Sequence, residues 1–296
     1  MSSKNDIIRA VNEILREYNM PLTLRQIYYR LVAMNLIENK LNSYKALSRM
    51  LVEAREKGLV PEHMIEDRAR STHGGDWGYR SPEQFVQGEV SDFKECWQRY
   101  TRPLWETQGS YIEVWVEKDA LSRLVSDVAD RFRVKTCVGR GYSSYTYVRD
   151  AVNRFKPMCE KVCTILYFGD HDPSGLDITR DLGRRMSDYG APFVDIRRVA
   201  LLPEQIERYD LPPAPVKMSD VRSAAFIKEH GTGVVELDAV EPKELQRMIH
   251  DAIRSEINIE EWNRVVNKID VEQEQVRESI SKIVEGFSGE GEEQGR

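Results

Sequence analysis

Apolar residues recur at helical spacing in three stretches near the start of the chain. The first stretch, residues 5–18, has one apolar stripe that includes Ile7, Val11 and Ile14. The second opens at Thr23, with Gln26 three residues later as in a capping box, and continues to about residue 34. The third runs from residue 43 to just before 58, with apolar positions on one side and basic positions on the other. The pattern predicts three short helices.

A short basic segment, predicted to be a β segment, follows the third helix. Three helices and such a segment are the outline of a winged helix, in which the third helix enters the DNA major groove. A helical bundle that only packs fits the same pattern, so both interpretations stay open. In the first, residues 1–72 are a DNA-binding domain, and its contacts to DNA come from five basic side chains: Lys45, Arg49, Arg55, Arg68 and Arg70.

Strands and helices alternate in the second half of the chain. Strands are predicted over 111–117, 134–138 and 162–168, with helices over 120–132 and 145–155 and another from about 176. The third strand is continuously apolar, which is typical of a strand buried on both faces. This alternation predicts an α/β fold with a parallel sheet and right-handed crossovers. Residues 73–108 are expected to be a linker and connecting helix, 109–286 a sheet domain with a helical extension, and 287–296 a disordered acidic tail.

Composition fits an ordinary globular protein, with 41% hydrophobic and 31% charged residues. The net charge of −6 is unevenly spread, because residues 1–80 carry 13 Lys and Arg against 10 Asp and Glu. A basic first part can bind DNA although the whole chain is acidic. Four scattered cysteines (Cys96, Cys137, Cys159 and Cys163) favour reduced thiols. No run is apolar enough for a membrane span, so we expect a cytoplasmic, nucleoid-associated protein with no membrane partner.

Carboxylates follow two of the predicted strands directly. Glu117 ends the first strand, and Asp170 and Asp172 follow the third. Because ligands of open parallel sheets bind at the carboxyl ends of the strands, the three side chains are expected to converge there. Mutual repulsion would be relieved by a cation, and hard oxygen ligands suit Mg²⁺. Acidic residues that merely cap the following helices are the alternative; two strand ends together favour the metal.

Two adjacent tyrosines lie on the second helix. At about 100° per residue, Tyr28 falls at the edge of the apolar stripe, whereas Tyr29 falls well off it, on the side of Arg25. Tyr28 is therefore expected to pack in the core, and Tyr29 to be exposed. Arg25, four residues earlier, would stabilise a phenolate or hold a phosphate, which a phenol with a pKa near 10 needs to attack phosphorus at neutral pH. Of the two tyrosines, Tyr29, with Arg25 beside it, is therefore the one suited to act as a nucleophile. Lys118 either lines a DNA path or is a solvated surface charge.

Two groups of motifs carry a family resemblance. Val116-Glu-Lys-Asp-Ala, Gly141-Tyr-Ser-Ser and Phe168-Gly-Asp-His-Asp-Pro-Ser-Gly together resemble a Toprim domain, the Mg²⁺-binding fold of topoisomerases, primases and some nucleases. Thr23-Leu-Arg-Gln-Ile-Tyr-Tyr-Arg resembles the catalytic motif of the topoisomerase VI A subunit and the meiotic double-strand-break transesterase. In that family a winged helix with a nucleophilic tyrosine precedes a Toprim domain. The similarity extends over roughly residues 5–250 and includes Val235-Glu-Leu-Asp-Ala.

The resemblance implies a homodimeric DNA transesterase. It assigns Glu117, Asp170 and Asp172 as Mg²⁺ ligands and the second tyrosine, Tyr29, as the nucleophile that forms a 5′-phosphotyrosyl link with double-stranded DNA. Each active site would join the tyrosine of one protomer to the metal site of the other. The short N-terminus has no counterpart of the extension that contacts the ATPase subunit, so a GHKL-type ATPase partner stays open. Two further readings also stay open: a DNA-binding homologue without productive cleavage, and a hydrolytic Toprim nuclease.

Overall fold

The computed structural model describes residues 3–18, 20–66, 75, 78–139 and 141–293, with those from 286 on described by their backbone alone. The fold is α/β, and the sheet core is parallel, as predicted. No helix among these residues is long and apolar enough to cross a membrane. The chain divides into two compact units, of which the first comprises 1–70 and 110–256 and the second 71–109 and 257–296.

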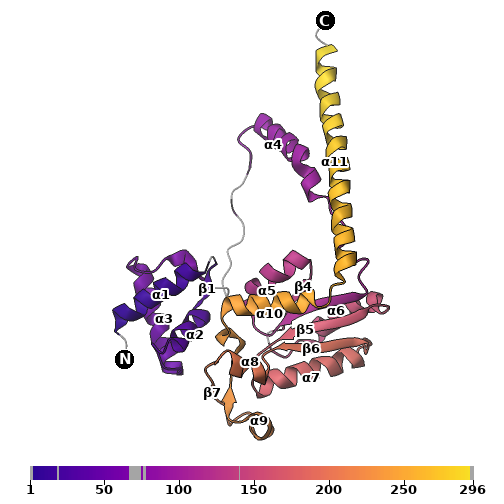
Figure 1. Cartoon of the computed structure of the whole chain (residues 1–296). Coiled ribbons are helices and arrows are strands. Elements are labelled where there is room, and N and C mark those ends of the chain that lie inside the picture. The colour runs from indigo at the N-terminus through magenta and orange to yellow at the C-terminus, as the bar shows by residue number, and fades with distance from the viewer. Residues whose placement is uncertain (1–2, 19, 67–74, 76–77, 140, 294–296) are drawn as a thin grey trace. The chain divides into compact units, whose positions relative to one another are not determined.

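Three helices open the first unit, close to their predicted bounds: α1 (Lys4–Glu17), α2 (Leu24–Ala33) and α3 (Leu41–Glu56) (Figure 1). The predicted capping box is confirmed, since the Thr23 side chain accepts from the Gln26 backbone and the Gln26 side chain accepts from the Thr23 backbone. Strand β1 (Leu22–Thr23) pairs in parallel with β2 (Ile65–Glu66), which follows the 3₁₀ turn η1 (Glu62–Met64).

The sheet of the first unit has four parallel strands in the order β4-β3-β5-β6. Their bounds are Ser110–Val116 (β3), Lys135–Val138 (β4), Val162–Phe168 (β5) and Val194–Ala200 (β6). The predicted three-strand alternation is confirmed, and β6 is an additional strand. Its inner residues are exposed or partly exposed, and three of them, Asp195, Arg197 and Arg198, are charged. The strand therefore lacks the apolar run of a doubly buried strand.

Helices cover both faces of this sheet. Helix α5 (Ser122–Ala129), flanked by η3 (Asp119–Leu121) and η4 (Asp130–Phe132), packs with α10 (Pro242–Arg254) on one face. Helices α6 (Tyr145–Phe155), followed by η5 (Lys156–Met158), and α7 (Pro173–Asp188) pack on the other (Figure 1). The core between the sheet and these two helices is centred on Trp115, Tyr167 and Phe155, each at most 1% exposed.

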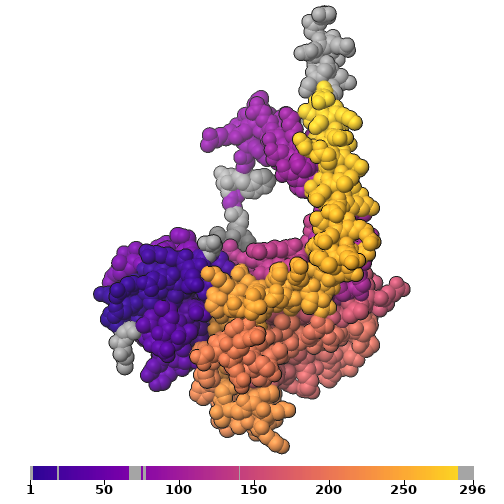
Figure 2. Space-filling model, in the orientation of Figure 1, coloured from indigo at the N-terminus to yellow at the C-terminus, as the bar shows by residue number. Residues whose placement is uncertain are grey.

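The chain after β6 returns to the N-terminal helices. It forms α8 (Pro203–Arg208), the antiparallel pair β7 (Ala214–Pro215) and β8 (Gly233–Val234), α9 (Ser223–His230) and η6 (Leu237–Ala239) before α10. The Tyr18 hydroxyl, at the end of α1, donates to Glu241 at the N-cap of α10 over 2.5 Å. Figure 2 accordingly shows the indigo surface of the first helices adjoining the orange surface of α10.

The second unit consists of α4 (Pro82–Glu95), η2 (Cys96–Arg99) and the long α11 (Ile259–Glu293). Its small core joins Leu104 to Val265 and Ile269, and Glu272 accepts hydrogen bonds from Arg102. The structure thus pairs the connecting segment with the C-terminal helix, whereas the predicted boundaries placed residues 109–286 in one domain. Helix α11 also extends to Glu293, so most of the segment predicted as a disordered tail is helical.

Candidate functional site

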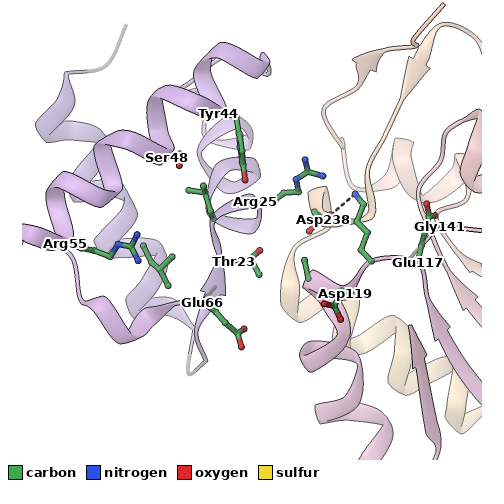
Figure 3. Close-up of a pocket in the computed structure, with 14 residues that line it drawn as sticks. Thr23, Arg25, Tyr44, Ser48, Arg55, Glu66, Glu117, Asp119, Gly141 and Asp238 are labelled. Carbon is green, nitrogen blue, oxygen red and sulfur yellow. Dashed lines mark hydrogen bonds and ion pairs between the residues drawn. The ribbon is translucent and has the colours of Figure 1, made fainter. Parts of the chain in front are cut away.

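A cavity of about 770 Å³ lies in the first unit, between the N-terminal helices and one edge of the sheet. Figure 3 shows Arg25, Tyr44 and Ser48 on one side of it and Glu117 and Asp238 on the other. The sheet edge is the one at which the chain crosses to opposite faces from β3 and from β5, the place where ligands of open parallel sheets bind. The complete lining is Thr23, Leu24, Arg25, Tyr44, Ser48, Arg55, Ile65, Glu66, Glu117, Lys118, Asp119, Ala120, Gly141 and Asp238.

The structure brings two of the predicted ligands together at this edge. Strands β3 and β5 are direct neighbours, with Val116 opposite Phe168, so Glu117 and Asp170 follow adjacent strand ends. The Asp170 backbone N–H donates to Glu117 Oε2 over 3.1 Å. Asp172, in contrast, caps α7: its Oδ1 accepts from the Gly175 backbone over 2.6 Å. The capping role that was weighed as the alternative therefore applies to Asp172.

Two glycines keep the space around the Glu117 carboxylate open. A Cβ atom at Gly169 would lie 2.7 Å from Glu117 Oε2, and one at Gly175 would lie 2.4 Å from the Asp170 carbonyl oxygen and 3.2 Å from Glu117 Oε2. No side chain fits at either position without displacing these oxygens. The two glycines thus form a cradle, since they leave room beside the backbone for the Glu117 carboxylate and the Asp170 carbonyl oxygen.

Charge repulsion is evident at the same edge. Burial, followed by the negative charges of Asp170 and Asp172, raises the pKa of Glu117 from 4.5 to about 7. Burial also raises the pKa of Asp170 to about 6, although the Lys118 ammonium opposes the rise. Both carboxylates are therefore held in surroundings that disfavour their charge, which is the condition that a bound cation relieves.

The three predicted ligands do not form a ready chelate in this conformation. Among the residues that the structure describes, no group of three or more His, Cys, Asp or Glu side chains is placed to hold a metal ion. Asp170 Oδ2 is engaged by Lys118 Nζ at 2.9 Å, and Asp172 is engaged at the helix terminus. The oxygen donors and the glycine cradle fit a Mg²⁺ ion in their chemistry, but Asp170 and Asp172 must turn to share one.

Lys118 is the centre of a charge cluster that the sequence did not reveal. Its ammonium lies 2.9 Å from Asp170 Oδ2, 2.9 Å from Glu236 Oε2 and 2.8 Å from Asp238 Oδ2. Lys118 is therefore not a solvated surface charge, since only 19% of its side chain is exposed, and it lies in the lining of the cavity. Glu236 and Asp238 are the site residues that sequence reasoning missed. The signal was Val235-Glu-Leu-Asp-Ala, in which two acids alternate with apolar residues beside the sheet domain.

The tyrosine prediction is half confirmed. Tyr28 is buried, and its hydroxyl lies 3.2 Å from the Lys40 carbonyl oxygen, to which it donates. Tyr29 was expected to be exposed, and this expectation is wrong, because only 7% of it is accessible. The apolar stripe predicts burial of only one side of α2. In the structure α2 packs against η6 as well as against α1 and α3. Burial and the nearby Glu236 carboxylate raise the pKa of the Tyr29 phenol well above its ordinary value of 10.

Arg25 faces the cavity, as a phosphate-binding residue should, but its guanidinium is already paired with a carboxylate. Its Nη1 lies 2.5 Å from Glu236 Oε2, and its guanidinium lies 5.8 Å from the centre of the Tyr44 ring. Glu236 therefore receives both Arg25 of α2 and Lys118 of the sheet edge. This shared carboxylate connects the predicted catalytic helix to the predicted metal edge.

The predicted DNA-binding residues are distributed over two sides of α3. Lys45 and Arg49 are exposed, whereas Arg55 turns toward the cavity and donates from Nε to the Leu51 carbonyl oxygen. Arg68 and Arg70 lie outside the residues that the structure describes. Tyr44 and Ser48 also face the cavity from α3, so this helix presents polar groups inward as well as outward.

Comparison with known proteins adds no further constraint. A search against models of protein families gives no match, and no curated protein shows significant similarity to the chain. What the site does therefore has to be inferred from its own geometry and chemistry.

Proposed function

We propose that the chain is a DNA-cleaving transesterase that acts on double-stranded DNA as a homodimer and requires Mg²⁺. In this proposal the N-terminal helices are a winged helix, the parallel sheet belongs to a Toprim domain, and the protein is similar to the A subunit of type IIB topoisomerases.

One observation carries the proposal. Arg25, of the tyrosine-bearing helix α2, and Lys118, beside the carboxylates of the sheet edge, bind the same Glu236 carboxylate within one unit of the chain. Two cations, Arg25 and Lys118, and the carboxylates of Glu117 and Asp238 thus line one cavity, and the candidate nucleophile Tyr29 lies near the shared Glu236. These are the groups that phosphoryl transfer to a tyrosine requires.

The chemistry is a transesterification at phosphorus. The Tyr29 oxygen forms a bond to the phosphorus of a backbone phosphodiester, the bond from phosphorus to the 3′ oxygen breaks, and the phenolic proton ends on that oxygen. Arg25 stabilises the phenolate and the charge on the phosphate. Glu117, Asp170 and Asp172 would hold Mg²⁺, which supplies positive charge next to the phosphate when it is bound.

The burial of Tyr29 supports a second candidate. A phenol with a raised pKa and little exposure is a poor nucleophile as it stands. A hydrolytic nuclease that uses the sheet-edge carboxylates and water would need no tyrosine. In the transesterase, by contrast, the buried Tyr29 side chain has to become exposed before it can reach DNA.

A covalent-complex assay separates these candidates. The protein is incubated with end-labelled duplex DNA and Mg²⁺ and then denatured, and label attached to protein is measured. Tyr29→Phe is compared with Tyr28→Phe, a matched change one residue away. We expect covalent label in the wild type and Tyr28→Phe and none in Tyr29→Phe. Free cut ends that persist in Tyr29→Phe would indicate the hydrolytic nuclease, and absence of any cutting would indicate a DNA-binding protein.

A further inference from the structure

Glu236 has surroundings that are unusual for a carboxylate. Arg25 Nη1 approaches it at 2.5 Å and Lys118 Nζ at 2.9 Å. Lys118 donates a hydrogen bond to it, and the Tyr29 phenol lies near enough to feel its charge. One carboxylate thus binds a guanidinium and an ammonium, with a phenol nearby, and these groups come from two distant parts of the chain.

These three donors are suited to a phosphate as well as to a carboxylate. A guanidinium binds phosphate and carboxylate oxygens in the same planar geometry, and an ammonium binds either as a point charge. A phosphodiester also carries one negative charge, like the carboxylate. Exchange of one for the other therefore leaves the total charge around Arg25 and Lys118 unchanged.

We infer that Arg25, Lys118 and the Tyr29 hydroxyl form a phosphodiester-binding site that Glu236 occupies as an internal mimic of the phosphate. While Glu236 is bound, Tyr29 stays buried near a carboxylate. A phosphodiester that displaces Glu236 takes over both cations and meets the phenol directly. Glu236 thereby makes access to Tyr29 depend on the presence of a phosphodiester.

The connection to the rest of the chain supports displacement rather than a fixed structural role. Glu236 lies between β8 and η6, in a short connection, and its side chain is 32% exposed. Lys118 retains its ion pairs with Asp170 and Asp238 when Glu236 leaves, so its buried ammonium still has negatively charged partners. Asp238, by contrast, has a side chain with no exposed surface and is suited to a permanent role.

The test uses the full-length protein and diethyl phosphate, a simple phosphodiester, in buffer without Mg²⁺. Binding is followed by ³¹P NMR titration in the wild type and in Glu236→Gln, which keeps the shape of the side chain but removes its charge. We expect Glu236→Gln to bind diethyl phosphate at least fivefold more tightly than the wild type. Nitration of Tyr29 by tetranitromethane, located by peptide mass, is expected to rise severalfold in the same variant.

Tyr18→Phe is the matched control. It removes a different hydrogen bond between the N-terminal helices and the α10 region, from Tyr18 to Glu241, without touching the anion site. Neither diethyl phosphate affinity nor Tyr29 nitration should change in this variant. A double variant, Arg25→Gln with Glu236→Gln, should lose the gained affinity. If Glu236→Gln does not fold, Glu236→Asp is used instead. This change withdraws the carboxylate by one methylene and should give a smaller increase in the affinity for diethyl phosphate.

Equal affinity for diethyl phosphate in the wild type and the folded Glu236 variant would overturn the inference. The inference rests on the proposed function only for the assignment of DNA as the natural phosphodiester. Covalent cleavage of DNA without this gain would reject the mimic and keep the transesterase. The gain in a protein that neither binds nor cuts DNA would keep the anion site and reject the transesterase.

Discussion

Arg25 and Glu236 lie 211 positions apart in the sequence, and their side chains meet at 2.5 Å. The pair joins helix α2 to the connection that follows β8, and through Lys118 it reaches the end of strand β3. A helix that would otherwise belong to an independent N-terminal bundle is thereby tied to the edge of the sheet. Five predictions test how this region and the neighbouring helix α3 are built and what they bind.

Removing the Lys118 charge should destabilise the protein strongly. Lys118→Met leaves Asp170, Glu236 and Asp238 close together without their shared cation, and breaking a buried ion pair in this way typically costs about 3–5 kcal/mol. The measurement is the free energy of unfolding in urea at pH 7. Lys243→Met is the control, because its pair with Glu17 is more than half exposed on both sides and should contribute about 0–1 kcal/mol. Similar losses in both variants would contradict a central role for Lys118.

Stability without metal should fall as the pH rises from about 4.5 to 7. The pKa of Glu117 is about 7 in the folded chain against 4.5 ordinarily, so between these values the folded state binds more protons than the unfolded state. Ionisation of Glu117 is thus unfavourable in the folded state, by about 2 kcal/mol after allowance for partial exposure. Urea denaturation at pH 5.5 and 8 should show this loss in the wild type and a smaller one in Glu117→Gln.

Mg²⁺ should counteract this loss of stability at high pH. Because a cation favours the ionised carboxylates, 5 mM Mg²⁺ is expected to raise the unfolding midpoint of the wild type more at pH 8 than at pH 5.5. The rise should be absent in Glu117→Gln. An equal rise in wild type and variant would place the ion elsewhere.

Gly175→Ala and Gly183→Ala should have opposite effects, although both glycines lie in α7. At Gly175 the new Cβ would lie 2.4 Å from the backbone oxygen of Asp170, which has to shift. We expect a loss of roughly 2 kcal/mol or more, together with weaker Mg²⁺ binding. At Gly183 the nearest atom is 3.5 Å away, an ordinary contact, so the better helix propensity of alanine should add up to about 1 kcal/mol. Thermal unfolding of the two variants provides the comparison.

The exposed face of α3 should determine the salt dependence of DNA binding. Replacing both Lys45 and Arg49 by Gln removes two exposed cations, so the slope of log affinity against log salt should become shallower by about 2. Fluorescence anisotropy with a labelled duplex at several salt concentrations measures the slope. Replacing Arg264 and Lys282 of α11 by Gln changes the net charge equally. An equal change of slope in this control would show that only total charge matters.

Much of the fold follows from local pattern. The three N-terminal helices, the Thr23–Gln26 capping box and the strands around 111–117 and 162–168 were predicted within a few residues, because each depends on near neighbours in the chain. Strand β6 was not, since an edge strand with charged side chains has no distinctive apolar pattern. The pairing of residues 71–109 with α11 was also missed, because it depends on contacts between segments far apart in sequence.

The candidate site shows the same division. That Glu117 and Asp170 follow neighbouring strand ends could be predicted from a general property of parallel sheets, although in the structure Asp170 contacts the Glu117 carboxylate through its backbone N–H. The burial of Tyr29 did not follow, because a helical stripe shows which face is apolar but not what packs against the opposite face. Here η6 and Glu236 supply that packing, from a segment far from α2 in the sequence.

The long separation between Arg25 and Glu236 also imposes an order in time. A ribosome synthesises α2, with Tyr29, long before it reaches the carboxylate that will engage Arg25. Lys118 likewise emerges before Asp170, and well before Glu236 and Asp238. A nascent or truncated chain that ends before residue 236 has the helix and its tyrosine but not the partner that holds them. Closure of the site therefore has to wait until residue 236 has been synthesised, and a product that ends earlier leaves Arg25 without this partner.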